Sequence, residues 1–108
     1  MLALRKVRAG FGIDIVEMEQ LHAPPAAGEV RVAVAAVGIC GSDLHAFEWT
    51  DGYGFMEAHM PLTLGHEFSG AVVAVGAGVG DLQVGDRVVC WPTVPCKNCA
   101  GCLAGRPE

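Results

Sequence analysis

Short runs of alternating apolar and polar residues, separated by glycine-rich turns, dominate this chain. Residues 2–8 and 13–20 alternate loosely on either side of Gly10 and Gly12. A period of two is typical of half-buried strands, and glycine between two such runs is typical of a tight turn. The N-terminal segment is therefore predicted to be a hairpin, and the paired prolines in residues 23–28 predict a loop after it.

Three further strands are predicted. In residues 29–37 valines alternate with other residues, and the last positions are all apolar, which predicts a strand that runs into the core. Residues 67–76 are rich in β-branched valine, and residues 87–90 follow a Gly85-Asp86 turn. Both patterns favour strands over helices.

A short helix is predicted from Ser42 to about Glu48. Ser42 or Asp43 is expected to cap its N-terminus. Leu44 and Phe47 lie three residues apart and are expected on the buried face.

Residues 49–61 show no hydrophobic period and are predicted to form a loop. We expect the aromatic side chains of Trp49, Tyr53 and Phe55 to anchor this loop. Residues 91–108 also lack a period, and they contain three closely spaced cysteines. Many short strands and little helix predict a mostly β fold, a partly open barrel with short helices and a cysteine-rich lobe.

Length and composition limit the classes of protein to consider. The 108 residues are enough for one domain, 1–108, and a content of 52% hydrophobic and 18% charged residues is typical of a folded chain. The net charge of −5 and the scattered Lys and Arg residues argue against nucleic-acid binding. Apolar runs are too short for a membrane span, and Arg5, Lys6 and Arg8 interrupt any signal peptide. A cytoplasmic location is expected, where thiols stay reduced.

Two short motifs supply the three residue types associated with catalytic zinc: a thiol from Cys40, an imidazole from His66 and a carboxylate from Glu67. Ser42, Asp43 and His45 lie within five residues of the thiol, where groups that transfer protons or support a ligand are needed. Each residue alone has a simpler explanation, since a buried cysteine is often a small hydrophobe and Asp43 is also a helix cap. Their combination favours a metal site.

Cys96, Cys99 and Cys102 form a second candidate metal group with C-x-x-C-x-x-C spacing. Structural zinc requires four ligands, and only three are present. A ferredoxin-type iron–sulfur site needs a cysteine where this chain has Arg106. Structural zinc is the first interpretation, an iron–sulfur site the second, and unliganded thiols the third. Cys90 ends a valine strand and is interpreted as an apolar residue.

These motifs resemble the N-terminal, GroES-like catalytic domain of the medium-chain zinc-dependent alcohol dehydrogenases. The resemblance rests on residues 38–45, Gly65-His66-Glu67 with Gly70, residues 84–88 and the cysteine run. It implies an oxidoreductase that transfers hydride from a small alcohol or polyol to NAD or NADP. It also implies a homo-oligomeric parent enzyme without nucleic-acid or membrane partners.

The resemblance also implies roles for individual residues. The catalytic zinc would be held by Cys40 and His66, with Glu67 beside it as an occasional ligand. Asp43 would hold the His66 ring, Ser42 would accept the proton of the substrate hydroxyl, and His45 would pass that proton toward solvent. The three cysteines of the later run would bind structural zinc.

Two family features are missing from the 108 residues. Residues 76–80 are glycine-rich, but a G-x-G-x-x-G fingerprint would require glycine at Asp81. The family's fourth structural cysteine would fall beyond residue 108. Both observations favour a fragment truncated before the Rossmann domain. Two alternatives remain, a metal-free GroES-like oligomeric interaction module and a zinc-independent quinone reductase.

We expect the isolated chain to be inactive and to bind zinc weakly or not at all. An assay with NAD or NADP and a panel of alcohols is expected to show no turnover. Appreciable turnover by the 108 residues would contradict the truncation hypothesis.

Overall fold

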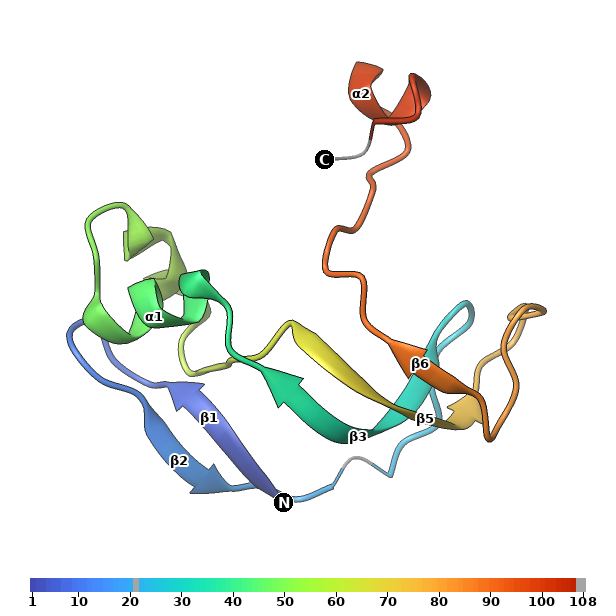
Figure 1. Ribbon diagram of the computed structural model, residues 1–108, viewed down its shortest axis with the longest axis horizontal. Helices are drawn as coiled ribbons and strands as arrows, with labels where there is room; N and C mark the ends of the chain where they lie inside the picture. The colour runs from blue at the N-terminus through green and yellow to red at the C-terminus, as the bar shows by residue number, and fades with distance from the viewer. Residues whose placement is uncertain (21, 107–108) are drawn as a thin grey trace.

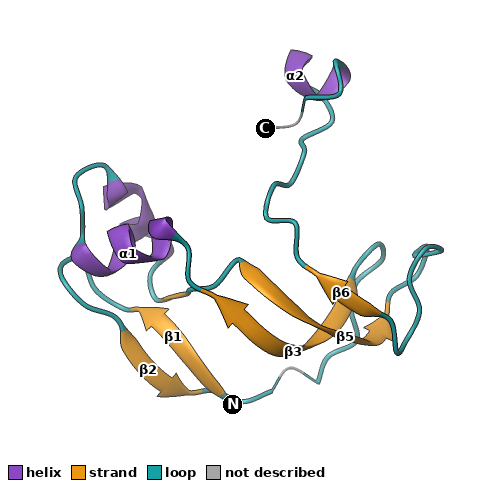
Figure 2. Ribbon diagram, in the orientation of Figure 1, coloured by secondary structure: helices purple, strands orange, loops and turns teal. Residues whose placement is uncertain are grey.

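The computed structural model describes residues 1–20 and 22–106 (Figures 1 and 2). In chain order its elements are β1 Leu2–Lys6, β2 Asp14–Glu17, β3 Val30–Gly38, α1 Gly41–Glu48, the 3₁₀ helix η1 Tyr53–His59, β4 Leu62–Thr63, β5 Glu67–Val75, β6 Arg87–Val89 and α2 Ala100–Leu103. Within the described residues the strands form two three-stranded sheets, ordered β2-β1-β4 and β3-β5-β6. The predicted mostly β, open architecture is confirmed, and neither sheet closes into a barrel.

The first sheet is built on the predicted N-terminal hairpin. β1 pairs antiparallel with β2 and, along its other edge, with β4. Strand β4 was not predicted, because a two-residue strand carries no readable alternation. Its pairing of Lys6 with Leu62 ties the N-terminus to the middle of the chain.

The second sheet brings the two predicted zinc motifs together. β3 and β5 are antiparallel, and their pairing runs from Val30 opposite Val75 to Gly38 opposite Glu67. Cys40 follows the end of β3 by two residues, and His66 precedes the start of β5. Antiparallel pairing therefore places both motifs at the same end of the sheet.

The expectation that the end of β3 sinks into the core is wrong. Val34 and Val37 are each 53% exposed. β3 is an edge strand that pairs only with β5, and the described residues supply no layer over this part of it. Apolar composition predicted burial, but burial also requires a covering element.

Helix α1 forms where it was predicted, but with a different cap, and of the two residues expected on its buried face only Phe47 is covered. Its N-cap is Cys40, and the Asp43 carboxylate accepts a hydrogen bond from the Cys40 backbone N–H at 3.0 Å. Leu44 is 55% exposed, whereas Ala46 is buried. The buried face is the one that meets the N-terminal hairpin, where Phe47 packs edge-on against a phenylalanine of the turn.

The predicted loop at residues 49–61 contains the helix η1. A short 3₁₀ helix forms its own backbone hydrogen bonds and needs no long hydrophobic period. The pattern of apolar and polar residues therefore did not predict η1. Tyr53 is half-buried and Met56 is buried within it. The anchoring role expected of Phe55 is wrong, because its side chain is 68% exposed.

The cysteine-rich lobe leaves the second sheet after β6 and ends in α2, which stands away from both sheets (Figure 1). Helix α2 has no buried residue. The lobe therefore has no apolar core, as its lack of a hydrophobic period predicted. No helix in residues 1–20 and 22–106 is long and apolar enough to cross a membrane.

The arrangement is open rather than tightly packed. The radius of gyration is 16.0 Å, compared with about 13 Å for a compact domain of this size. The accessible surface is 7814 Å², compared with about 5,700 Å² expected for a compact monomer of this mass. Among the described residues the buried apolar side chains are Ala46, Met56 and Val72. Strand register and individual polar contacts therefore carry more of the architecture than a large core does.

Gly70 allows β3 and β5 to approach closely. A Cβ at this position would collide with the backbone carbonyl oxygen of Ala33. Gly70→Ala is therefore expected to lower the free energy of unfolding by about 3 kcal/mol, the upper range for overpacking. Urea titration is the measurement. Gly80→Ala is the control, because nothing lies within 4 Å of its added Cβ; equal losses in both variants would contradict the expectation.

Candidate metal centre

Cys40, His66 and Glu67 converge at the end of the second sheet. One ligand atom from each lies within 4.8 Å of the other two. Metal–ligand distances of about 2.0–2.3 Å place the ligands of a tetrahedral zinc about 3–4 Å apart. The donor set of one thiol, one imidazole and one carboxylate therefore fits zinc after small side-chain movements.

Gly65 allows His66 to reach this position. Its φ of +109° lies in the region that favours glycine, and a Cβ there would stand 3.0 Å from Cγ1 of Val37. The connection from β4 to β5 can therefore pass close to β3. This places the imidazole beside the thiol that follows β3.

Asp43 links the helix to the imidazole. While Oδ2 accepts from the Cys40 backbone N–H, Oδ1 lies 3.8 Å from Nδ1 of His66. A carboxylate that faces one ring nitrogen orients the ring and favours the tautomer that leaves the other nitrogen for a metal. The structure therefore brings Asp43 next to the residue that it was predicted to support.

The contacts of Cys40 favour its ligating form. Hydrogen bonds from Ser42, first from its side chain and then from its backbone, lower the pKa of the Cys40 thiol, and His66 contributes in the same direction. The bond to Cys40 in turn raises the pKa of His66. A thiolate is the form of cysteine that binds metals.

Of the two predicted proton carriers, Ser42 joins this group and His45 does not. Oγ of Ser42 lies 3.4 Å from Nε2 of His66. The His45 ring is exposed; its Nδ1 lies 3.2 Å from Oγ1 of Thr50, and its centroid lies 5.6 Å from that of Tyr53. The relay role of His45 stays a prediction.

A cleft of about 330 Å³ opens beside His66, the one of the three ligands that lines it. Its lining residues are Ser42, Asp43, Ala46, Tyr53, Phe55, Met56, Leu62, Thr63, Leu64, Gly65 and His66. Leu62 and Leu64 were missed from the sequence. Their position just before Gly65-His66 was the available signal, but both side chains are apolar and carry no group that binds a metal or transfers a proton.

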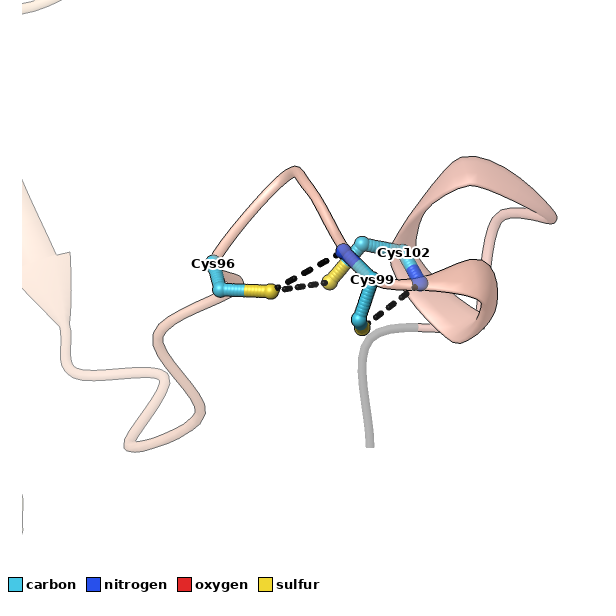
Figure 3. A group of neighbouring side chains, drawn as sticks. All are labelled: Cys96, Cys99 and Cys102. Atoms are coloured by element: carbon cyan, nitrogen blue, oxygen red, sulfur yellow. Dashed lines mark hydrogen bonds between the residues drawn. The ribbon is translucent and has the colours of Figure 1, made fainter.

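The three cysteines of the terminal lobe also converge (Figure 3). Sγ of Cys96 and Sγ of Cys102 are 3.7 Å apart, and the backbone N–H of Cys99 donates to Sγ of Cys96 at 3.4 Å. Lys97, with a φ of 62°, makes the tight turn between them. These three thiols fit a thiolate-bound metal, and no further Cys, His, Asp or Glu joins their group in the part of the chain that the structure describes. Cys90 is half-buried and belongs to neither group.

Comparison with known proteins gives a consistent result. Residues 26–108 match the alcohol dehydrogenase GroES-like domain. An L-threonine 3-dehydrogenase of Cutibacterium acnes is 42% identical over 98% of this chain and 30% of its own length. A galactitol 1-phosphate 5-dehydrogenase of Escherichia coli K12 is 49% identical over 71% of this chain and 21% of its own.

A solved structure has the same fold. The alcohol dehydrogenase from E. coli CFT073, complexed with the cofactor NADH, superposes with a TM-score of 0.77 at 39% identity. The match covers 99% of this chain and 29% of that protein. The chain spans at most about 30% of the length of the curated relatives described above.

Cys96 is expected to be a reactive thiol. Hydrogen bonds from the backbone N–H groups of Asn98 and then Cys99 lower its pKa to about 7. Because only the thiolate is alkylated, the rate of its reaction with iodoacetamide should rise as pH increases through about 7. Peptide mass spectrometry measures the rate. A rate that begins to rise only near the ordinary cysteine pKa of about 8.5 would contradict this expectation.

Proposed function

The chain belongs to the alcohol dehydrogenase GroES-like domain family, and we propose that it is the metal-holding N-terminal part of a zinc-dependent dehydrogenase. The parent enzyme would oxidise an alcohol or polyol with NAD or NADP as hydride acceptor. The observation that carries this proposal is the convergence of Cys40, His66 and Glu67, together with the cleft that His66 lines. The two relatives described above, which are dehydrogenases of hydroxylated molecules, support it.

The donor atoms fit zinc, with Cys40 and His66 as the main ligands and Glu67 as a further or occasional one. When bound there, zinc would act as a Lewis acid toward the substrate hydroxyl oxygen. Asp43 would keep the His66 ring in its ligating orientation, because its carboxylate faces Nδ1 and is itself fixed by the backbone of Cys40.

Ser42 would take the proton of the substrate hydroxyl. Its Oγ lies at the cleft and within 3.4 Å of Nε2 of His66. A serine hydroxyl accepts one proton only if it passes its own proton on, so a second carrier is needed. We assign that task to His45, whose exposed ring can exchange protons with water.

The cleft supports a small-molecule substrate. Its volume of about 330 Å³ lies within the usual range for ligand pockets. Its lining combines aromatic and aliphatic side chains with the polar side chains of Ser42, Asp43, Thr63 and His66. This mixture suits the carbon chain and hydroxyl groups of an alcohol or polyol.

The cysteine-rich lobe would hold a second, structural zinc. Three thiols within a short segment give a lobe without an apolar core the cross-link that it needs. The two alternatives, a metal-free interaction module and a zinc-independent reductase, give no reason for either ligand group to converge.

Cys40→Ala in the parent dehydrogenase tests the proposal. Loss of the thiolate should remove one equivalent of zinc and reduce turnover below detection, while zinc at the three-cysteine lobe remains. Elemental analysis and a steady-state assay measure the two effects. Cys90→Ala is the matched control, since Cys90 is outside both groups and should keep metal and activity. Retention of both metal and turnover in Cys40→Ala would refute the proposal.

A further inference from the structure

Lys6 is the one charged side chain that is fully buried within the described residues. It does not line the cleft and does not belong to either metal group. Burial, followed by the charge of Arg8, lowers the pKa of Lys6, as expected when an ammonium group loses water. A buried charge is costly unless specific contacts replace its hydration, so the contacts of Lys6 indicate what it does.

The ammonium of Lys6 joins the hairpin turn to the end of α1. Nζ donates to the carbonyl oxygens of Gly10 and Gly12, the latter at 2.8 Å. The same Nζ lies 4.9 Å from the ring centroid of Trp49, the residue that ends α1 in a left-handed conformation. This distance is within the range of a cation–π interaction.

The turn that Lys6 holds is itself attached to α1. The backbone N–H of Gly12 donates to the carbonyl oxygen of Phe47 at 2.7 Å. The rings of Phe11 and Phe47 pack edge to face with centroids 4.6 Å apart. The C-terminal end of α1 is therefore fixed by Lys6 directly and through the turn. The other end of this short helix carries Ser42 and Asp43.

The backbone around Lys6 also fixes the approach to His66. Lys6 pairs with Leu62, and Arg5 pairs with Thr63, in the β1–β4 register. The backbone N–H of Leu64 donates to the carbonyl oxygen of Leu4 at 2.9 Å. The end of β1 therefore holds the segment that leads, two residues later, to the imidazole.

We propose that Lys6 is a positioning residue that sets the placement of α1 relative to β4, and through it the spacing between Ser42, Asp43 and His66. Its backbone holds the segment before His66, and its side chain holds the helix that carries the other two residues. The inference has a mechanical part, the placement of α1 relative to β4, and a metal part, the effect of that placement on the metal ligands. Only the metal part rests on the proposed function.

Lys6→Met tests the mechanical part, because it keeps an unbranched apolar stem and removes the hydrogen-bond donor. Amide hydrogen exchange at Gly12 and across the last turn of α1 should become at least about tenfold faster, which corresponds to the loss of roughly one charged hydrogen bond. Exchange at Val72 in the second sheet should not change. Arg8→Met is the matched control, since it removes the same charge from an exposed side chain paired with Asp14 at 3.1 Å.

Cadmium binding tests the metal part. Cadmium-113 NMR distinguishes a site with few thiolates from a site with several, so one titration of the parent dehydrogenase reports both groups. In Lys6→Met the affinity at Cys40 and His66 should fall by about tenfold, the lower end of the effect seen when the support of a ligand is lost. The signal of the three-cysteine lobe should not change and serves as the internal reference.

The outcomes are distinguishable. Unchanged exchange at Gly12 in Lys6→Met, or equal changes in Arg8→Met, would overturn the inference. If the unaltered parent dehydrogenase binds no cadmium at Cys40, the proposed function is contradicted, while the exchange experiment still decides the role of Lys6. Faster exchange at Val72 in Lys6→Met would mean that this variant is destabilised as a whole. Trp49→Leu then takes its place, and the inference requires faster exchange at Gly12 with unchanged exchange at Val72.

Discussion

The antiparallel register of β3 and β5 is the constraint on which the candidate site depends. Gly38 stands opposite Glu67, so the thiol that follows one strand and the imidazole that precedes the other meet at one end of the sheet. A slip of one residue would turn every side chain of the moved strand to the other face and would separate these groups. Gly70, packed against the backbone of Ala33, makes such a slip costly because a larger residue would not fit there.

Much of the site was predictable, because the residue types that bind a metal can be recognised directly in the sequence. The thiol, imidazole and carboxylate were identified from two glycine-framed motifs, and the strands that join them from valine alternation. The cap of α1 was not predictable from the sequence. Cysteine is not a usual capping residue, and Asp43 bonds to the Cys40 backbone from the third position of the helix. The exposure of Val34 was also not predictable, because alternation identifies a strand but does not say whether another layer covers it.

The two metal groups differ in what must fold before they exist. The thiols of Cys96 and Cys102 are six residues apart, and local turns are enough to bring them together. Ser42 and His66 are 24 residues apart and meet only when the second sheet has formed. Closing the longer loop costs more conformational entropy, which the strand pairing must repay. Disruption of β3–β5 pairing should therefore disperse one group and leave the other intact.

A metal at the first group would connect parts of the chain that share little core. Cys40 lies where β3 passes into α1, whereas His66 lies between β4 of the first sheet and β5 of the second. Few apolar side chains are buried between these elements, so the contacts of Lys6 and the ligands themselves hold the junction. Because binding free energy at a site assembled only by folding is also folding free energy, metal affinity and the stability of this junction should change together. Contacts that fix the junction therefore matter to the chemistry even where they touch neither metal nor substrate.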